Sequence, residues 1–261
     1  YAVSDDERKA VIKMVVEEVK GGNVVLAGAA HAGTPETIKM CQYAESVGAD
    51  GVQLVLPYYH VPTEEGMYQH YKQIAESVGQ DFGIMLYNNP FVSGSWVKPP
   101  LMAKLSKIPN FIAVKENTPY MDPYYEMQRA VDSKDTVILC GMGERLFSFE
   151  ALYACTGFVS GNANFMPELS YSLYKAAAAR DFSKVADIVN SITPYDSFVN
   201  KVAANHGPHT GIGGAGGNMY ISVIKAAMDI VGLRGGEVRL PLVGLNKEEK
   251  DELSFILKTM L

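Results

Sequence analysis

The most constraining feature of this sequence is a regular alternation of short apolar runs with longer amphipathic stretches. The runs hold five to seven mostly aliphatic residues each, and they are residues 24–30, 51–56, 83–87, 111–115, 137–141 and 157–161. Runs of this length and composition are typical of strands buried on both faces of a parallel sheet. Strands that alternate with helices predict parallel βα units joined by crossovers.

The amphipathic stretches carry helix signals. Residues 4–20 open with the capping box formed by Ser4 and Glu7, and residues 34–47 open with Thr34 as the predicted cap. Beyond residue 161 the pattern changes to helices alone, predicted over residues 167–179, 183–204, 218–233 and 246–261. The strand region fits a closed (β/α) barrel or an open doubly wound sheet. No run is followed by a dinucleotide-binding fingerprint, which favours the barrel.

Composition excludes several functional classes. The formal net charge of -6 argues against nucleic acid as the main partner, because that binding depends on clustered Lys and Arg. No apolar run approaches the roughly 20 residues of a membrane span, and the first residues show no signal peptide. Cys41, Cys140 and Cys155 share no metal-ligand spacing, so reduced thiols in a cytoplasmic protein are expected.

A lysine and a tyrosine stand at the ends of two neighbouring strands. Side chains alternate across a strand, so Tyr87 and Lys115 point away from the aliphatic residues that face the helices. In a parallel barrel the carboxyl ends of the strands hold the active site. Desolvation lowers the pKa of a lysine, and its neutral amine can attack a carbonyl to form a Schiff base, with a tyrosine moving protons. The alternative from spacing alone is a Lys115 paired with a carboxylate such as Glu116.

Five motifs occur in order along the chain: Pro57-Tyr58-Tyr59, Glu65-Gly66-Met67-Tyr68-Gln69-His70-Tyr71, Tyr87-Asn88-Asn89-Pro90, Val114-Lys115-Glu116 and Gly157-Phe158-Val159-Ser160-Gly161-Asn162-Ala163-Asn164. Together they resemble the dihydrodipicolinate synthase / N-acetylneuraminate lyase family of class I Schiff-base enzymes, over nearly the whole chain. The resemblance implies an α/β fold, a (β/α)8 TIM barrel with a C-terminal helical extension. The barrel would take residues 1–165, and its last helix and the extension residues 166–261.

The same resemblance implies the site. Lys115 would form the imine and Tyr87 would handle protons, without a cofactor or a metal. Tyr59 matches a tyrosine that reaches into a partner subunit in many members, which implies a homo-oligomer, either a dimer or a tetramer. Substrate contacts are implied for Gly141, Glu144, Gly161 and Asn162.

Two departures from the family pattern matter. The synthase branch carries an arginine for a substrate carboxylate where this chain has Val92, and an aliphatic side chain cannot make that ion pair. Residues 92–94 look more like the sugar-acid lyase branch. The first strand–helix–strand unit, with its carboxylate-binding loop, is also absent from this chain. We expect an incomplete N-terminus rather than a truncated, impaired protein.

The resulting prediction is a lyase that forms a lysine Schiff base with a pyruvate-type 2-oxo acid and cleaves or condenses a 2-oxo-3-deoxy sugar acid. The alternatives are a dehydratase of a deoxy-keto sugar acid of the 5-dehydro-4-deoxyglucarate type and dihydrodipicolinate synthase itself. A barrel that binds an oxo acid without turnover is the non-enzyme alternative. The substrate is a small molecule, and neither nucleic acid nor membrane is an expected partner.

Weaker signals lie elsewhere. The Gly-rich residues 211–217 look like a phosphate cradle, but no strand precedes them and no Lys-Ser/Thr follows, so a loop is the favoured interpretation. His206 and His209 could bind a metal, but the sequence offers no further ligand and exposed loop histidines are favoured. His31 follows the first apolar run at the active-site end and is a candidate substrate contact.

Overall fold

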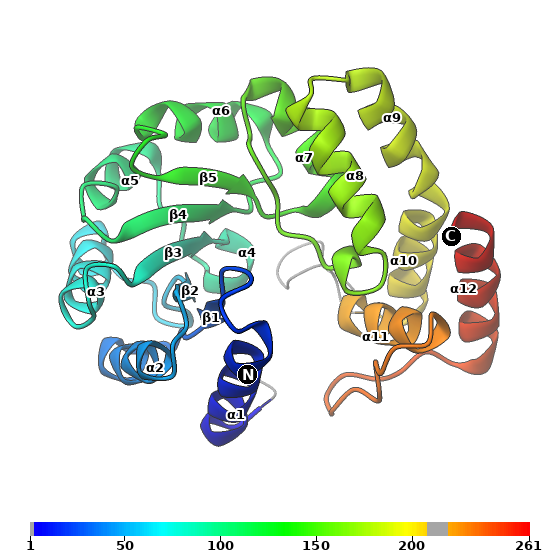
Figure 1. Cartoon of the computed structure of the whole chain (residues 1–261), viewed down its shortest axis with the longest axis horizontal. Coiled ribbons are helices and arrows are strands. Elements are labelled where there is room, and N and C mark those ends of the chain that lie inside the picture. The colour runs from blue at the N-terminus through cyan, green and yellow to red at the C-terminus, as the bar shows by residue number, and fades with distance from the viewer. Residues whose placement is uncertain (1–2, 208–218) are drawn as a thin grey trace. The chain divides into compact units, whose positions relative to one another are not determined.

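The alternating pattern folds into βα units in the N-terminal part of the chain (Figure 1). The computed structural model describes residues 3–207 and 219–261. The chain divides into two compact units, Tyr1–Gly141 and Met142–Leu261. Residues 211–217 and His209 lie outside the described residues.

The first unit contains a five-stranded parallel sheet within the described residues. Its strands follow the order of the chain and are β1 (Leu26–Gly28), β2 (Gly51–Val55), β3 (Gly83–Asn88), β4 (Phe111–Glu116) and β5 (Val137–Cys140). The helices of this unit are α1 (Asp5–Val19), α2 (Thr34–Ser46), α3 (Glu64–Glu76), the single turn α4 (Pro90–Ser93), α5 (Pro99–Leu105) and α6 (Met121–Ala130). Helices α2, α3, α5 and α6 follow one another along one side of the sheet (Figure 1). This arrangement confirms the predicted parallel α/β class.

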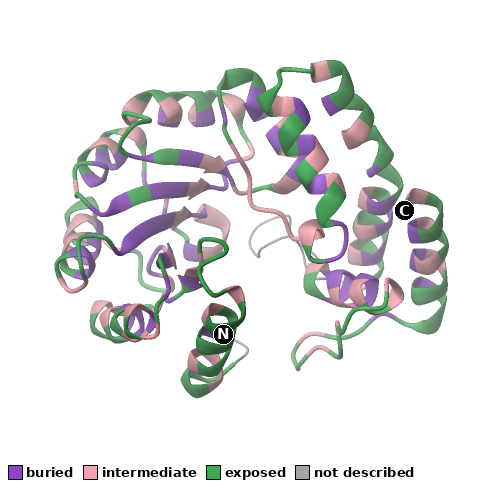
Figure 2. Cartoon of the chain, in the orientation of Figure 1, coloured by how far each residue is buried: buried purple, intermediate pink, exposed green. Residues whose placement is uncertain are grey.

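The core of the first unit lies between the sheet and these helices. Alternate strand positions supply it, and the fully buried members are Val52, Leu54, Ile84, Leu86 and Val114. Figure 2 shows the strands largely buried and the outward helix faces exposed. Tyr87 and Lys115 occupy the other parity of β3 and β4, so the alternation that builds the core also turns these two side chains away from it.

The starts of two helices test the predicted caps. Helix α1 begins with the expected capping box, in which Ser4 Oγ accepts from the Glu7 amide at 3.2 Å and Glu7 Oε2 accepts from the Ser4 amide at 2.8 Å. The prediction for Thr34 is wrong, because Gly33 is the N-cap and Thr34 is the first helical residue of α2. Its hydroxyl lies 2.9 Å from His70 Nδ1, so this side chain binds α3 instead of capping its own helix.

The second unit is helical. Its described residues form the helices α7 (Gly143–Glu150), α8 (Pro167–Ala178), α9 (Phe182–Ser191), α10 (Thr193–Asn205), α11 (Tyr220–Ile230) and α12 (Lys247–Met260), and the short 3-10 turns η1 (Ala151–Tyr153) and η2 (Asn162–Asn164). Tyr195 and Phe198 of α10, Val223 of α11 and Leu253 of α12 belong to one buried cluster. Within the described residues, no helix combines the length and the hydropathy that a bilayer crossing requires.

Two predictions for this unit are wrong. Residues 157–161 form no strand, and within them Phe158 alone makes a bridge. Gly157, Ser160 and Gly161 leave little strand-forming sequence there, and the Phe158 ring stacks on Phe147 with centroids 4.4 Å apart. The single helix expected over residues 183–204 is two helices, because Pro194 lacks a backbone N–H and is tolerated in the first turn of α10 but not inside a longer helix.

Candidate active site

Two side chains lie together at the carboxyl ends of strands β3 and β4. Tyr87 and Lys115 are paired in the parallel register, so both leave the sheet on the same face. Lys115 Nζ lies 4.0 Å from the centroid of the Tyr87 ring. Within the described residues, Lys115 has no carboxylate partner. The structure therefore brings together the two residues that the sequence singled out, and it contradicts the alternative in which Glu116 neutralises the lysine.

The surroundings of this pair shift both titrations in the direction that favours the neutral forms. Burial lowers the pKa of Lys115 to about 8, and the neighbouring Cys140 opposes this shift only in part. Burial raises the pKa of Tyr87 above its usual value of 10, against the opposing effect of a hydrogen bond from Asn89. At pH 7 the phenol is protonated, while about a tenth of the amine is neutral.

Glu116 points to the opposite face of β4 and is fully buried there. Its Oε2 accepts from Asn88 Nδ2 at 2.7 Å, and its Oε1 accepts from the Thr118 amide at 3.0 Å. Burial raises the pKa of Glu116 to about 7, although the hydrogen bond from Asn88 works in the other direction. The Asn88 side chain also binds both backbone groups of Val97, at 2.9 and 3.0 Å. These contacts join the ends of β3 and β4 directly behind Tyr87 and Lys115.

Gly141 follows β5 and lies against the end of β4. Its amide donates to the Glu116 carbonyl oxygen at 2.7 Å. A Cβ atom at this position would overlap the Asn117 side chain and lie 2.8 Å from the same carbonyl oxygen. The close approach of the two backbones therefore requires glycine, which places Gly141 one strand away from Lys115.

Tyr59 lies in the loop after β2 and is 89% exposed. Its φ of 74° is left-handed, a conformation that a tyrosine rarely adopts, and its ring meets His60 edge to face at 4.9 Å. The side chain is thus held outward from the first unit. Its predicted contact with a partner subunit stays a prediction.

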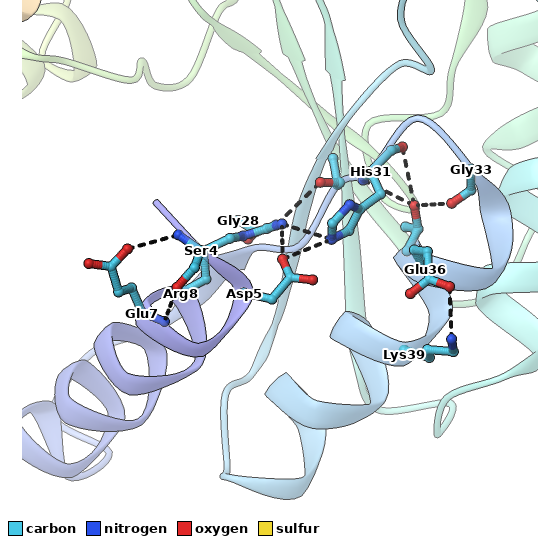
Figure 3. A network of polar contacts seen from close by, with 11 residues as sticks. Ser4, Asp5, Glu7, Arg8, Gly28, His31, Gly33, Glu36 and Lys39 are labelled. Carbon is cyan, nitrogen blue, oxygen red and sulfur yellow. Dashed lines mark hydrogen bonds and ion pairs between the residues drawn. The ribbon is translucent and has the colours of Figure 1, made fainter. Parts of the chain in front are cut away.

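His31 belongs to a polar network at the end of β1 (Figure 3). Its Nε2 lies 3.0 Å from Arg8 Nη1 and 3.2 Å from Asp5 Oδ1. Arg8 Nη2 also donates to the carbonyl oxygens of Gly28 and Ala30, at 2.9 and 3.2 Å. These contacts connect the start of α1 to the end of β1, so His31 has a structural role. Its contact with substrate stays a prediction.

The remaining predicted site residues lie in the second unit, around a buried carboxylate. Glu144 Oε1 accepts from the hydroxyls of Ser160 and Ser170, the latter at 2.6 Å, and Glu144 Oε2 accepts from Asn162 Nδ2 at 3.0 Å. Gly161 is beside them, and a Cβ atom there would overlap the Tyr220 hydroxyl. Glu144, Gly161 and Asn162 therefore form one cluster, and their contact with substrate stays a prediction. His206, in the same unit, lies 2.8 Å from Glu249 Oε1.

The sequence did not point to Asn88, Asn89 or Ser170, although all three contact a predicted site residue or support its strand. The two asparagines stand in the tyrosine motif itself, directly before a proline. An asparagine that precedes Pro at a strand end is a common helix cap, and this was the one signal that could have drawn attention to Asn89. Ser170 carries no local signal, because its partner is 26 residues away.

The parallel α/β unit and its partly buried lysine beside a protonated tyrosine define a class of site that can form an imine with a carbonyl compound. The chain belongs to the dihydrodipicolinate synthetase family, whose model matches residues 1–260.

Similar proteins agree with this placement. The 4-hydroxy-tetrahydrodipicolinate synthase of Geobacter metallireducens is 34% identical over 257 residues, which cover 97% of this chain and 80% of that protein. The protein of the same name from Methanocaldococcus jannaschii is 32% identical over 259 residues, 99% of this chain and 82% of that protein.

Solved structures show the same relationship. The crystal structure of dihydrodipicolinate synthase from Aquifex aeolicus matches with a TM-score of 0.83 and 29% identity, over 98% of this chain and 81% of that one. A prophage protein of Escherichia coli K12 from the dihydrodipicolinic acid synthase family, solved in complex with pyruvate, matches with a TM-score of 0.84 and 25% identity, over 99% of this chain and 82% of that one. The family consists of class I Schiff-base lyases, and the chain is a lyase of this class. The preference for the sugar-acid branch is not confirmed, since these relatives carry the synthase name.

Proposed function

We propose that Lys115 is the imine-forming lysine of a lyase that acts on a 2-oxo acid of the pyruvate type. The observation that carries the proposal is the position of Lys115, which lies 4.0 Å from the Tyr87 ring on a paired strand and has no carboxylate partner among the described residues. A lysine with a lowered pKa supplies a nucleophilic amine, and a protonated phenol supplies the proton that the carbonyl oxygen needs.

The chemistry follows from these two groups. The lone pair of Lys115 Nζ attacks C2 of the oxo acid, and the electrons of the C=O bond move to oxygen, which takes a proton from the Tyr87 phenol. The nitrogen then returns a proton to the Tyr87 phenolate, and the re-formed phenol protonates the C2 hydroxyl, which leaves as water and gives an iminium ion. The Tyr87 phenolate takes the proton of the C4 hydroxyl as the C3–C4 bond breaks; the electron pair of that bond moves toward the iminium, so that an aldehyde leaves and an enamine of pyruvate remains. The Tyr87 phenol, protonated in this step, gives its proton to C3 before water hydrolyses the imine.

For the substrate, we propose a 2-oxo-3-deoxy sugar acid. Val92 lies in α4, directly after the Tyr87 strand, where the synthase branch has an arginine for a substrate carboxylate. An aliphatic side chain cannot make that ion pair, whereas it tolerates an uncharged polyol tail. The same imine would also serve the removal of water from a deoxy-keto sugar acid. Dihydrodipicolinate synthesis is the second candidate, because the relatives named above carry the synthase name.

We further propose that the five parallel strands belong to a closed (β/α)8 barrel, with the boundary of the C-terminal helical part near residue 165. The exposed Tyr59 would enter the site of a second copy in a homo-oligomer, either a dimer or a tetramer. The three buried cysteines are thiols rather than disulfides, which fits a protein of the reducing cytoplasm.

One experiment tests the mechanism and the substrate together. The protein is incubated with pyruvate and borohydride, and the labelled peptide is located by mass spectrometry; the reduced adduct is expected on Lys115 and absent from Lys115→Met. Turnover is then measured with 2-oxo-3-deoxy sugar acids, with sialic acid, and with aspartate semialdehyde plus pyruvate. A label elsewhere overturns the role of Lys115, and turnover of the semialdehyde alone favours the synthase. Pyruvate binding without turnover of any substrate favours a barrel that only binds an oxo acid.

A further inference from the structure

We infer that Asn89 is a positioning residue that makes the Tyr87 phenol oxygen a hydrogen-bond acceptor, so that the phenol keeps its own proton for the bound oxo acid. The inference rests on the proposed role of Tyr87. Asn89 lies outside the Lys115–Tyr87 pair, and the supporting observation is the direction of its hydrogen bond to the Tyr87 phenol oxygen.

The direction of that bond follows from the other end of the Asn89 side chain. Asn89 is the N-cap of α4, and its Oδ1 accepts from the Phe91 amide at 3.1 Å. A backbone N–H only donates, so the oxygen of the Asn89 amide must face Phe91. The Nδ2 group then faces Tyr87, 2.8 Å from its phenol oxygen. An –NH2 group only donates, so Tyr87 accepts in this pair.

The amide is held in this orientation. Asn89 is 1% exposed, and its backbone carbonyl oxygen accepts from Ser93 Oγ at 2.8 Å, which fixes the main chain from which the side-chain amide extends. Rotating the amide by half a turn would place two donors opposite each other at Phe91 and remove the cap, which costs about 1 kcal/mol. Pro90, which follows directly, restricts the backbone at Asn89 to the extended region that an N-cap uses.

The consequence concerns the phenol proton. A tyrosine oxygen that accepts from Asn89 directs its own O–H elsewhere, and Lys115 lies over the ring on the same face of the sheet. An acidic or hydroxyl side chain at position 89 could instead accept the phenol proton and hold it away from a substrate. The identity of residue 89 therefore decides whether the phenol is a donor toward the ligand.

The test uses a substitution that keeps the cap and reverses the bond. In Asn89→Asp the side chain caps α4 as well as asparagine does, but it offers only acceptors, so Tyr87 must donate to it. The measurement is the exchange of the C3 protons of pyruvate for deuterium in D2O, followed by proton NMR, which needs no second substrate. We expect the exchange rate to fall roughly 100-fold, the lower range of a lost general acid.

Two further variants separate this role from a structural one. Asn89→Ala removes both the cap and the donor, so a merely structural residue would suffer more from alanine than from aspartate. We expect the opposite order, with a fall of about tenfold for alanine, because aspartate sequesters the proton and alanine does not. In a Tyr87→Phe background, Asn89→Asp should cause no further fall, since the group on which it acts is gone.

The outcomes are distinguishable. Any of three results for Asn89→Asp overturns the inference. The first two are an exchange rate within twofold of the parent rate and an exchange rate above that of Asn89→Ala. The third result is that the substitution lowers the rate by the same factor in the Tyr87→Phe background. A parent protein that neither exchanges nor is trapped by borohydride on Lys115 overturns the proposed function instead. Should Asn89→Asp fail to fold by circular dichroism, the cycle of Asn89→Ala with Tyr87→Phe remains, and full additivity in it overturns the role of Asn89.

Discussion

The lowered pKa of Lys115 leads to a quantitative expectation for imine formation as the pH changes. At pH 7 a lysine with a pKa of about 8 is neutral in roughly one molecule in ten, whereas at the ordinary value of 10.5 it is neutral in about one in 3,000. Burial of the amine thus raises the reactive fraction roughly 300-fold at neutral pH. The rate of imine formation should rise about tenfold from pH 6 to pH 7, reach half its maximum near pH 8 and level off above it. Tyr87 stays protonated over this range, because burial raises its pKa.

The assay is reductive trapping of pyruvate by cyanoborohydride between pH 6 and pH 9.5, with the reductant in excess so that imine formation limits the rate. Mass spectrometry of the Lys115 peptide reports the extent of labelling, and Lys115→Met provides the blank. The exposed Lys39 serves as an internal reference in the same digest, since an exposed amine outside the site should be labelled only slowly. A half-maximal rate above pH 10 for Lys115 would refute the argument that burial activates this amine.

Three further predictions concern the groups around the lysine. Lys115→Met should raise the free energy of unfolding by up to about 3 kcal/mol at pH 7, because the unfolded chain binds the lysine proton more tightly than the folded protein does. Urea titrations should show this gain decreasing between pH 8 and pH 10.5. Burial also favours the neutral form of Glu116, so the folded protein binds more protons than the unfolded chain between pH 4.5 and 7. The free energy of unfolding should therefore fall by roughly 3 kcal/mol as the pH rises through that window. Glu116→Gln should remove this fall, and an unchanged pH dependence would contradict the argument. Gly141→Ala should cost about 1–3 kcal/mol in thermal unfolding, since a Cβ overlaps Asn117, whereas the matched Gly28→Ala, with nothing within 4 Å of the new Cβ, should stay within about 1 kcal/mol of the parent.

Much of the first unit follows from its sequence. The runs at 51–56, 83–87, 111–115 and 137–141 start where strands β2 to β5 start, because strands buried on both faces of a parallel sheet have continuous aliphatic runs. The failures lie where local sequence is a weak determinant. Residues 157–161 resemble a strand in hydropathy, but the Ser160 hydroxyl binds Glu144, a contact that no local pattern encodes.

The site divides in the same way. The pairing of Tyr87 with Lys115 follows from strand order and side-chain alternation, so the sequence was sufficient for it. The orientation of the Asn89 side-chain amide was not predictable from the sequence. It depends on the four-residue helix α4, in which the backbone N–H of Phe91 donates to Asn89 Oδ1. The hydrogen bonds to the Glu144 carboxylate were not predictable either, because their three donors lie 16, 18 and 26 residues further along the chain.

Side-chain alternation also explains why the pKa of Lys115 is lowered although a glutamate follows it directly. The two residues leave β4 on opposite faces, so Glu116 meets Asn88 while Lys115 meets the Tyr87 ring. Both pKa values then move toward neutrality, Lys115 to about 8 and Glu116 to about 7, because burial disfavours charge of either sign. On one face the same pair would form an ion pair, which raises the pKa of the lysine and removes its nucleophilicity. The lowered pKa of the Lys115 amine therefore depends on the position of this residue in the alternation of β4. A one-residue shift in the register of this strand would exchange the environments of Lys115 and Glu116.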